Sequence, residues 1–357
     1  MIGVENKAMS TIIGACGYGA TGSSAIMDLL REFDNTNILS KIEFILPYFP
    51  DGLEDLEYHV RNYHKYMASA VAINRFRKFT KWPMFTRVTN GEIKKLTDDF
   101  LSKIVQISWN GRSWADKYIR STGELFIASA FFTLIRKLRF IKSNKLCDNL
   151  FKHKIEISIM SENFDASSKY FMTEILNAMG RDPQKMTVLD QPFEGCNPVK
   201  SFKYFENPKA IVVDRDPRDH YLFAKNFLRP RGLAQIPCDN ADDYIQYFRL
   251  IRKSPLDLRK RDDIIFLNFE ELIYDYENAV SRVANFCGVS EHTHKGVYFK
   301  PTHSRNNTQL FKKYTGFEED IAKIERELPE YLFHFENYPD VKAEDGMFYG
   351  SQRRKKR

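Results

Sequence analysis

Short apolar runs alternate with amphipathic segments through both end regions of the chain. The apolar runs predict buried strands at 11–13, 187–190, 210–214 and 264–268. A further short strand is predicted at 42–45, where Pro47 and Pro50 end the run. Segments with helical spacing of apolar residues follow most of these runs, at 23–33, 217–228, 241–254, 257–260 and 269–287. Buried strands that alternate with helices predict an α/β fold, a three-layer arrangement with a central parallel sheet between helices.

The middle of the chain has a different pattern. Helical spacing continues through 53–79, 92–107, 113–142 and 165–180, mixed with many Lys and Arg residues. Internal repeats and long linkers are not visible in the sequence. We therefore predict one α/β domain over 1–350 with a large helical insertion at about 51–185, followed by a basic disordered tail at 351–357.

A glycine-rich segment joins the first strand to the first helix. It reads Gly17, Tyr18, Gly19, Ala20, Thr21, Gly22, Ser23 and Ser24. Glycines allow backbone conformations that side chains forbid, so backbone N–H groups can converge on an anion where a helix begins. The order of strand, loop and helix indicates a phosphate-binding loop; a plain tight turn is the alternative. Because nucleoside triphosphatases have Lys at the position of Ser23, the loop argues against ordinary ATP hydrolysis.

Two further motifs follow later strands. Arg215, Asp216 and Pro217 leave the end of the 210–214 strand, where a guanidinium is well placed to bind a phosphate. The alternative is that Arg215 and Arg218 pair with Asp214, Asp216 and Asp219. The second motif is Phe269-Glu-Glu-Leu, followed by a helix that Gly288 is expected to end.

In this order, the three motifs resemble those of the sulfotransferases that use 3′-phosphoadenosine-5′-phosphosulfate (PAPS). Within that family, the resemblance is greatest to the bacterial and glycan sulfotransferases. The resemblance covers the first 45 residues and about 205–315. It implies that the loop, with Ser23 and Ser24, holds the 5′-phosphosulfate and that Arg215 holds the 3′-phosphate. No metal is expected. It also implies transfer of the sulfuryl group to a hydroxyl or amine of an acceptor that the helical insertion binds.

The resemblance also implies a catalytic base. In similar glycan sulfotransferases a glutamate lies beyond the loop in a short apolar strand, and Glu43 stands at that position. The alternative is a surface carboxylate at a strand edge. His59, His64 and His220 are the other candidates for the base.

The sequence departs from the family at two positions. Many members carry a loop Lys where this chain has Ala20, and a Ser eight residues after the 3′-phosphate Arg where it has Phe223. Cations from elsewhere are therefore expected to replace the missing charge. The candidates for the loop charge are Lys41, Arg305, Lys312 and Lys313, with Ser304 beside them. Near Phe223, the candidates to replace the missing Ser are Lys225, Asn226, Arg229 and Arg231.

The composition of the chain indicates which ligands and which cell compartment suit the protein. The formal net charge of +7 suits an anionic cofactor or acceptor, and part of it comes from the tail Arg353–Arg357. That tail is either a solvated end or a contact with an anionic membrane surface. The five cysteines lack metal-ligand spacing and suit a reducing compartment. No run is long enough to span a membrane and no secretory signal is visible. We therefore expect a cytoplasmic protein, peripheral at most to the inner membrane face.

The acceptor is expected to be a carbohydrate or polysaccharide. Trp82, Trp109 and Trp114 lie in the basic, aromatic stretch 53–142, where they either stack on sugar rings or fill the core. Two other functions stay open, a P-loop kinase-like phosphotransferase and a non-catalytic nucleotide-binding relative. Nucleic-acid binding is not expected, because no recognised module is present.

Overall fold

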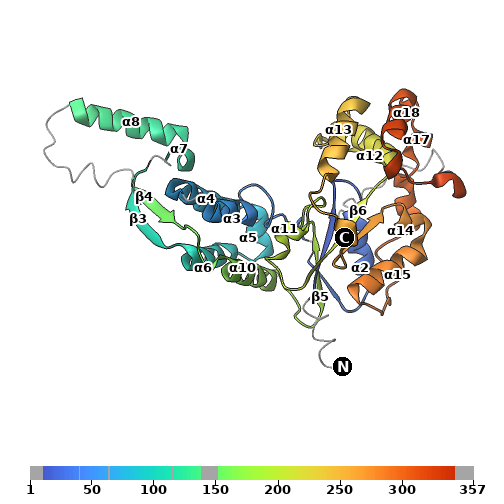
Figure 1. The fold of residues 1–357 in the computed structure, drawn as a ribbon, viewed down its shortest axis with the longest axis horizontal. Helices are drawn as coiled ribbons and strands as arrows, with labels where there is room; N and C mark the ends of the chain where they lie inside the picture. The colour runs from blue at the N-terminus through green and yellow to red at the C-terminus, as the bar shows by residue number, and fades with distance from the viewer. Residues whose placement is uncertain (1–10, 40, 63–64, 114–115, 138–151, 342–357) are drawn as a thin grey trace. The chain divides into compact units, whose positions relative to one another are not determined.

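The computed structural model describes residues 11–39, 41–62, 65–113, 116–137 and 152–341 (Figure 1). The chain forms two compact units. The first contains Met1–Phe44, Arg181–Phe202 and Glu206–Arg357, and the second contains Ile45–Gly180 with Lys203–Phe205. Most of the stretch expected to be a helical insertion lies in the second unit. The tail 351–357, His64, Trp114 and Cys147 lie outside the described residues.

The first unit is built on a five-stranded parallel sheet with the order β2-β5-β1-β6-β7. Its strands are β1 (Ile12–Gly17), β2 (Thr36–Leu39), β5 (Met186–Asp190), β6 (Pro208–Asp214) and β7 (Ile264–Asn268). The predicted α/β class with a central parallel sheet is therefore confirmed. Since all five strands run in one direction, the residues that follow β1, β5, β6 and β7 lie at one edge of the sheet, where ligands of such folds bind.

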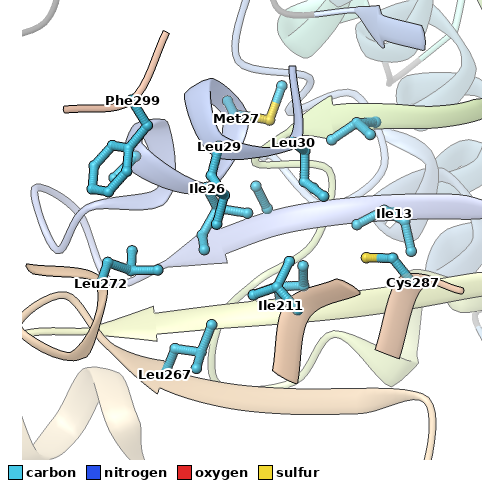
Figure 2. Close-up of a cluster of buried hydrophobic side chains, with 14 of the residues drawn as sticks. Ile13, Ile26, Met27, Leu29, Leu30, Ile211, Leu267, Leu272, Cys287 and Phe299 are labelled. Atoms are coloured by element: carbon cyan, nitrogen blue, oxygen red, sulfur yellow. The ribbon is translucent and has the colours of Figure 1, made fainter. Parts of the chain in front are cut away.

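Helices cover both faces of this sheet. On one face, Ile13 and Ile211 pack against Ile26 and Leu30 of α2 (Ser23–Leu30) and against α15 (Tyr276–Cys287), as Figure 2 shows. On the other face, Gly14 lies under the ring of Phe193. A Cβ at Gly14 would approach that ring within 2.5 Å. Phe193 packs in turn on Phe202 of α11 (Val199–Phe202).

The remaining helices of the first unit follow β6 and β7. They are α12 (Pro217–Phe223), a π-helical turn (Ala224–Leu228), α13 (Ala241–Arg252), α14 (Glu271–Tyr274), α16 (Pro301–Ser304), α17 (Leu310–Lys313) and α18 (Glu318–Glu327). Short 3₁₀ turns occupy Arg229–Arg231, Leu258–Lys260, Arg305–Asn307, Pro329–Tyr331 and Phe335–Asn337. Gly288 ends α15 with a φ of 73°, so the predicted helix stop is confirmed.

The predicted strand at 42–45 is wrong. The strand in this region is β2, which pairs with β5 through Thr36↔Met186 to Leu39↔Leu189. Residues 42–45 continue past the end of β5, where the N–H of Phe44 donates to the carbonyl of Asp190 at 2.7 Å. Ile42 and Phe44 are buried and Glu43 is exposed, so the alternation is that of a strand although no ladder forms.

The second unit is mostly helical, as predicted. Its helices are α3 (Leu53–Arg61), α4 (Tyr66–Phe79), α5 (Pro83–Val88), α6 (Ile93–Ile104), α7 (Asp116–Ile119), α8 (Thr122–Lys137) and α10 (Phe164–Ala178). Its core is aromatic, with Phe76, Phe100 and Phe171 in mutual ring contact. A two-stranded antiparallel sheet, β3 (Ile107–Gly111) with β4 (His153–Ile157), was not predicted. Within the described ranges, no helix is both long and apolar enough to cross a membrane.

Candidate functional site

Three residues of the glycine-rich loop between β1 and α2 have left-handed backbone. The φ angles are 80° at Gly19, 56° at Ala20 and 110° at Gly22, which precedes the first residue of α2. Gly22 also lies against Phe269, since a Cβ there would approach the ring Cδ2 within 2.6 Å. Both the φ angle and the close approach therefore require glycine at this position.

Six consecutive backbone N–H groups of the loop, from Gly19 to Ser24, donate to no acceptor among the described residues. The two N–H groups before them are used inside the loop region. Gly17 donates to Gln191 Oε1 at 3.2 Å, and Tyr18 donates to Thr21 Oγ1 at 3.0 Å. Unpaired donors at the start of a helix, where the helix dipole is positive, form an anion-binding site.

The carbonyl groups of the same loop are held by donors from other elements. His220 Nε2 lies 2.9 Å from the Gly19 carbonyl, and Arg215 Nη1 lies 3.3 Å from the Ala20 carbonyl. Burial lowers the pKa of His220 to about 3, so the imidazole is neutral and donates from Nε2 to the carbonyl. Because the carbonyls are engaged in this way, the loop keeps a conformation that leaves its N–H groups for a ligand.

Gln191 braces the loop from the neighbouring strand. It follows β5 with a φ of 51°, its Oε1 accepts from Gly17 N–H, and its Nε2 donates to Ser23 Oγ at 3.0 Å. Ser23 therefore keeps its own hydroxyl proton to donate to an anion. Sequence reasoning missed Gln191. The only available signal was its place directly after an apolar strand.

Arg215 is placed against the loop but is buried, with 4% of its surface exposed. Its guanidinium donates to the carbonyls of Ala20 and Asn307 and lies 4.6 Å from the centre of the Phe223 ring. The alternative pairing is confirmed for Arg218, which pairs with Asp216, whereas Asp214 pairs with Arg252. The assignment of Arg215 to the 3′-phosphate stays a prediction, and such a phosphate would have to replace a backbone carbonyl as its partner.

The Phe269–Leu272 motif supports the same region. Phe269 packs on Gly22, and Glu270 Oε1 accepts the N–H of Asp216 at 3.1 Å. Burial, together with the nearby carboxylates of Asp216 and Asp219, raises the pKa of Glu270 well above its ordinary value. The motif thus joins the segment after β7 to the glycine-rich loop and to the segment after β6.

Glu43, the predicted base, is exposed and lies near Asp190. Burial first, and then the negative charges of Glu43 and Asp28, raises the pKa of Asp190 to about 7. Its Oδ1 is buried without a hydrogen-bond partner in the described part of the chain. Sequence reasoning did not select Asp190, although it ends a predicted strand at the ligand-binding edge.

Three of the expected replacement cations are engaged elsewhere. Arg305 donates to the carbonyl of Pro339, Lys312 pairs with Asp340, and Lys313 donates to the carbonyl of Asn306. Their segment does approach the loop, since Arg215 bridges the carbonyls of Ala20 and Asn307. The fourth expected cation, Lys41, is exposed. Of the loop residues predicted to bind the cofactor, Ser24 is exposed and Thr21 is buried.

The side chain of Ala20 packs on an apolar cluster that includes Phe223, Phe227 and Leu310. Near Phe223, the three cations named from the sequence also have partners: Lys225 lies on Asp320, Arg229 on Asp239, and Arg231 on the carbonyl and ring of Phe227. Asn226 is half-buried beside them. Over the described ranges, no group of three or more His, Cys, Asp or Glu side chains is arranged to hold a metal ion.

Comparison with known proteins gives a limited result. No protein-family model and no curated protein matches the chain. Several solved structures are similar, among them these three. The sulfotransferase domain of the Synechococcus PCC 7002 olefin synthase is 11% identical, covers 93% of this chain and 95% of its own, and has a TM-score of 0.35. The sulfotransferase domain of the curacin biosynthetic pathway is 13% identical, covers 96% and 94%, and has a TM-score of 0.34.

The third similar structure is retinol dehydratase in complex with androsterone and the inactive cofactor PAP. It is 12% identical, covers 94% of this chain and 83% of its own, and has a TM-score of 0.34. Two of the three are thus sulfotransferase domains, the family that the sequence motifs resemble. Because every TM-score is below 0.5, the functional assignment rests on the geometry of the loop and not on these similarities.

Proposed function

We propose that the protein is a PAPS-dependent sulfotransferase. The observation that carries this proposal is the row of unpaired N–H groups from Gly19 to Ser24 at the start of α2, in a loop without the lysine of nucleoside triphosphatases. A 5′-phosphate fits that row. The hydroxyl of Ser23, oriented by Gln191, adds a further donor.

PAPS supplies an activated sulfuryl group, whose transfer breaks the bond from sulfur to the 5′-phosphate oxygen and forms a bond to the acceptor oxygen or nitrogen. The loop N–H groups stabilise the negative charge on the leaving phosphate, as donors do in phosphoryl transfer. Arg215 orients the loop through the Ala20 carbonyl and is the proposed ligand of the 3′-phosphate. No metal takes part in this proposal.

A base near the loop takes the proton from the acceptor. Glu43 is the proposed base. Asp190 is the competing candidate, since a pKa of about 7 suits a general base near neutral pH. The two are separated by Glu43→Gln and Asp190→Asn: the variant that loses turnover while it still binds the product, adenosine 3′,5′-bisphosphate (PAP), identifies the base.

The acceptor we propose is a hydroxyl or amine compound of the carbohydrate class. The half-exposed rings of Trp82 and Trp109, both in the second unit, support this proposal because sugar rings stack on such surfaces.

The location that we propose is cytoplasmic. None of the four described cysteines forms a disulfide, which supports a reducing compartment.

Calorimetric titration tests the proposal. PAP is expected to bind, adenosine 5′-monophosphate to bind more weakly because it lacks the 3′-phosphate, and ATP with Mg²⁺ to bind no better than the monophosphate. Strong binding of ATP with Mg²⁺ and none of PAP would favour a kinase and refute the proposal. Transfer of ³⁵S from PAPS to a panel of sugars, phenols and amines then separates an active enzyme from a binding-only relative.

A further inference from the structure

His220, on α12, joins the glycine-rich loop to α13. Its side chain is buried, and each of its ring nitrogens has one partner. Nε2 lies 2.9 Å from the carbonyl oxygen of Gly19, and Nδ1 lies 2.9 Å from the hydroxyl oxygen of Tyr244. The imidazole therefore lies between the loop and α13, against two groups that can each accept a hydrogen bond.

The contact with Gly19 acts on one of the free donors of the loop. The Gly19 carbonyl belongs to the same peptide group as the N–H of Ala20, which donates to no acceptor among the described residues. A positive group at a carbonyl polarises the amide, so its N–H becomes a stronger donor. Arg215 makes the same kind of contact one peptide further along, at the Ala20 carbonyl. A charge on His220 would therefore act at Ala20, where many sulfotransferases have the loop Lys.

The surroundings of His220 satisfy the ring in both of its protonation states. The neutral ring donates from Nε2 and accepts the hydroxyl proton of Tyr244 at Nδ1. The imidazolium donates from both nitrogens, and the Tyr244 hydroxyl then donates to the carbonyl of Pro217, 2.8 Å away. A proton is therefore gained by turning one hydroxyl group, and neither ring nitrogen loses its partner.

Positive charges act on the imidazole in the free protein. Burial first, then the guanidinium of Arg252 on α13, and also that of Arg215, lower the pKa of His220 to about 3. The carboxylates that act on the adjoining hydroxyl of Tyr244 are already paired, Asp214 with Arg252 and Asp216 with Arg218. An anion on the free loop N–H groups brings the opposing negative charge. Each nearby opposite charge raises the pKa of a base by about 1–3.

We propose that His220 takes up a proton when an anion binds to the loop, and that the imidazolium supplies the positive charge that the loop lacks at Ala20. His220 is thus a positioning residue, because it acts on the ligand through the peptide group of Gly19 and Ala20. The inference rests on the proposed function only in that a doubly charged group occupies the loop. Anion affinity is then greatest below the pKa of the bound state and falls as the pH rises, because the proton is released.

Calorimetry in two buffers of different ionisation enthalpy counts the protons taken up when PAP binds. PAP exchanges protons of its own, so the measured quantity is the difference between the wild type and His220→Gln. Glutamine can still donate to the Gly19 carbonyl but cannot carry the charge. At about pH 6, the wild type is expected to take up about 0.5 proton or more above the variant and to bind PAP about tenfold more tightly, a gain that disappears at about pH 8. The control His294→Gln, at an exposed histidine of the same unit, is expected to match the wild type.

Nuclear magnetic resonance reports the charge of the ring directly. In protein with ¹³C-labelled imidazoles, the signal that is missing from His220→Gln identifies His220 among the eight histidines. At about pH 6, the ring is expected to be neutral in the free protein and charged in protein saturated with inorganic sulfate. Tyr244→Phe removes the hydroxyl that accepts the Nδ1 proton, so its His220 is expected to stay neutral in both states.

Two results would overturn the inference. They are a ring that stays neutral with sulfate or PAP bound, and equal proton uptake by the wild type and His220→Gln. Sulfate keeps its double charge over this pH range and needs only the anion site, so it decides the inference even if PAP does not bind. Failure of PAP alone to bind would refute the sulfotransferase proposal and leave the inference supported by the sulfate result. If neither anion binds, both proposals fail.

Discussion

Replacing Gly22 by alanine tests the geometry of the loop most directly. Alanine in left-handed backbone costs about 1–2 kcal/mol, and the φ of 110° lies beyond the usual left-handed region. The new Cβ also approaches Phe269 Cδ2 within 2.6 Å and Cγ within 3.1 Å, and overpacking of this kind costs about 1–3 kcal/mol. We therefore expect Gly22→Ala to lower the free energy of unfolding by about 2–5 kcal/mol.

Gly19→Ala is the matched control, because Gly19 belongs to the same loop and has a φ of 80°, but a Cβ there meets nothing within 4 Å. It is expected to lower the free energy of unfolding only by the backbone cost of about 1–2 kcal/mol. Urea unfolding followed by circular dichroism measures both variants through the midpoint, with an unchanged m-value.

The contact with Phe269 predicts a coupling between the two positions. In the double variant Gly22→Ala/Phe269→Ala, the clash is largely removed, so its destabilisation is expected to be smaller than the sum of the two single effects by about 1 kcal/mol or more. Equal destabilisation by Gly22→Ala and Gly19→Ala, together with additive single effects, would show that Phe269 does not restrict the loop. PAP affinity, measured by calorimetry on the folded variants, is expected to fall more for Gly22→Ala.

Three other predictions concern single side chains. Gln191→Leu leaves the Gly17 N–H without its acceptor and is expected to weaken PAP binding about tenfold, whereas Gln246→Leu, on the exposed side of α13, leaves calorimetric affinity unchanged. In the folded state Asp190 has a pKa of about 7, above its ordinary value of 3.8. The folded state therefore keeps a proton that the unfolded state has lost, and the free energy of unfolding falls as the pH rises from about 4 to about 7. Between pH 5 and pH 8, the free energy of unfolding from urea titration should therefore rise for Asp190→Asn relative to the wild type by about 2–3 kcal/mol; a pH-independent difference contradicts this. Glu32 is buried and accepts from His292 and from three backbone N–H groups, so Glu32→Gln is expected to cost about 2–4 kcal/mol in urea unfolding, and a cost below 1 kcal/mol would contradict it.

The loop was predictable from the sequence because its determinants are local. Glycines at 19 and 22 supply the left-handed backbone, and a helical pattern follows directly after them. Gln191 was not predictable, since it reaches the loop only through the pairing of β5 with β1. That pairing joins residues far apart in the chain, and no local pattern specifies which strands are neighbours.

The strand prediction at 42–45 failed for a related reason. Ile42, Phe44 and Leu46 are buried, so the alternating pattern correctly indicated which side chains are buried. A strand needs a ladder of hydrogen bonds as well, and the segment runs past the end of β5, where one bond to Asp190 forms. The ladder is formed instead by the more polar segment Thr36–Leu39. Strand β3, in which Ile107 and Trp109 are exposed, has no alternation of buried and exposed residues from which to predict it.

The two departures from the sulfotransferase pattern prove to be one structural feature. Ala20, where many members have Lys, and Phe223, where they tend to have Ser, belong to the same apolar cluster around Leu310. The ring of Phe223 lies against the guanidinium of Arg215, which donates to the carbonyl of Ala20. A lysine at position 20 alone would direct a charge toward this cluster, where burial without a partner is costly. In the proposed function, the loop N–H groups, braced by Gln191, His220 and Arg215, take the role of that lysine.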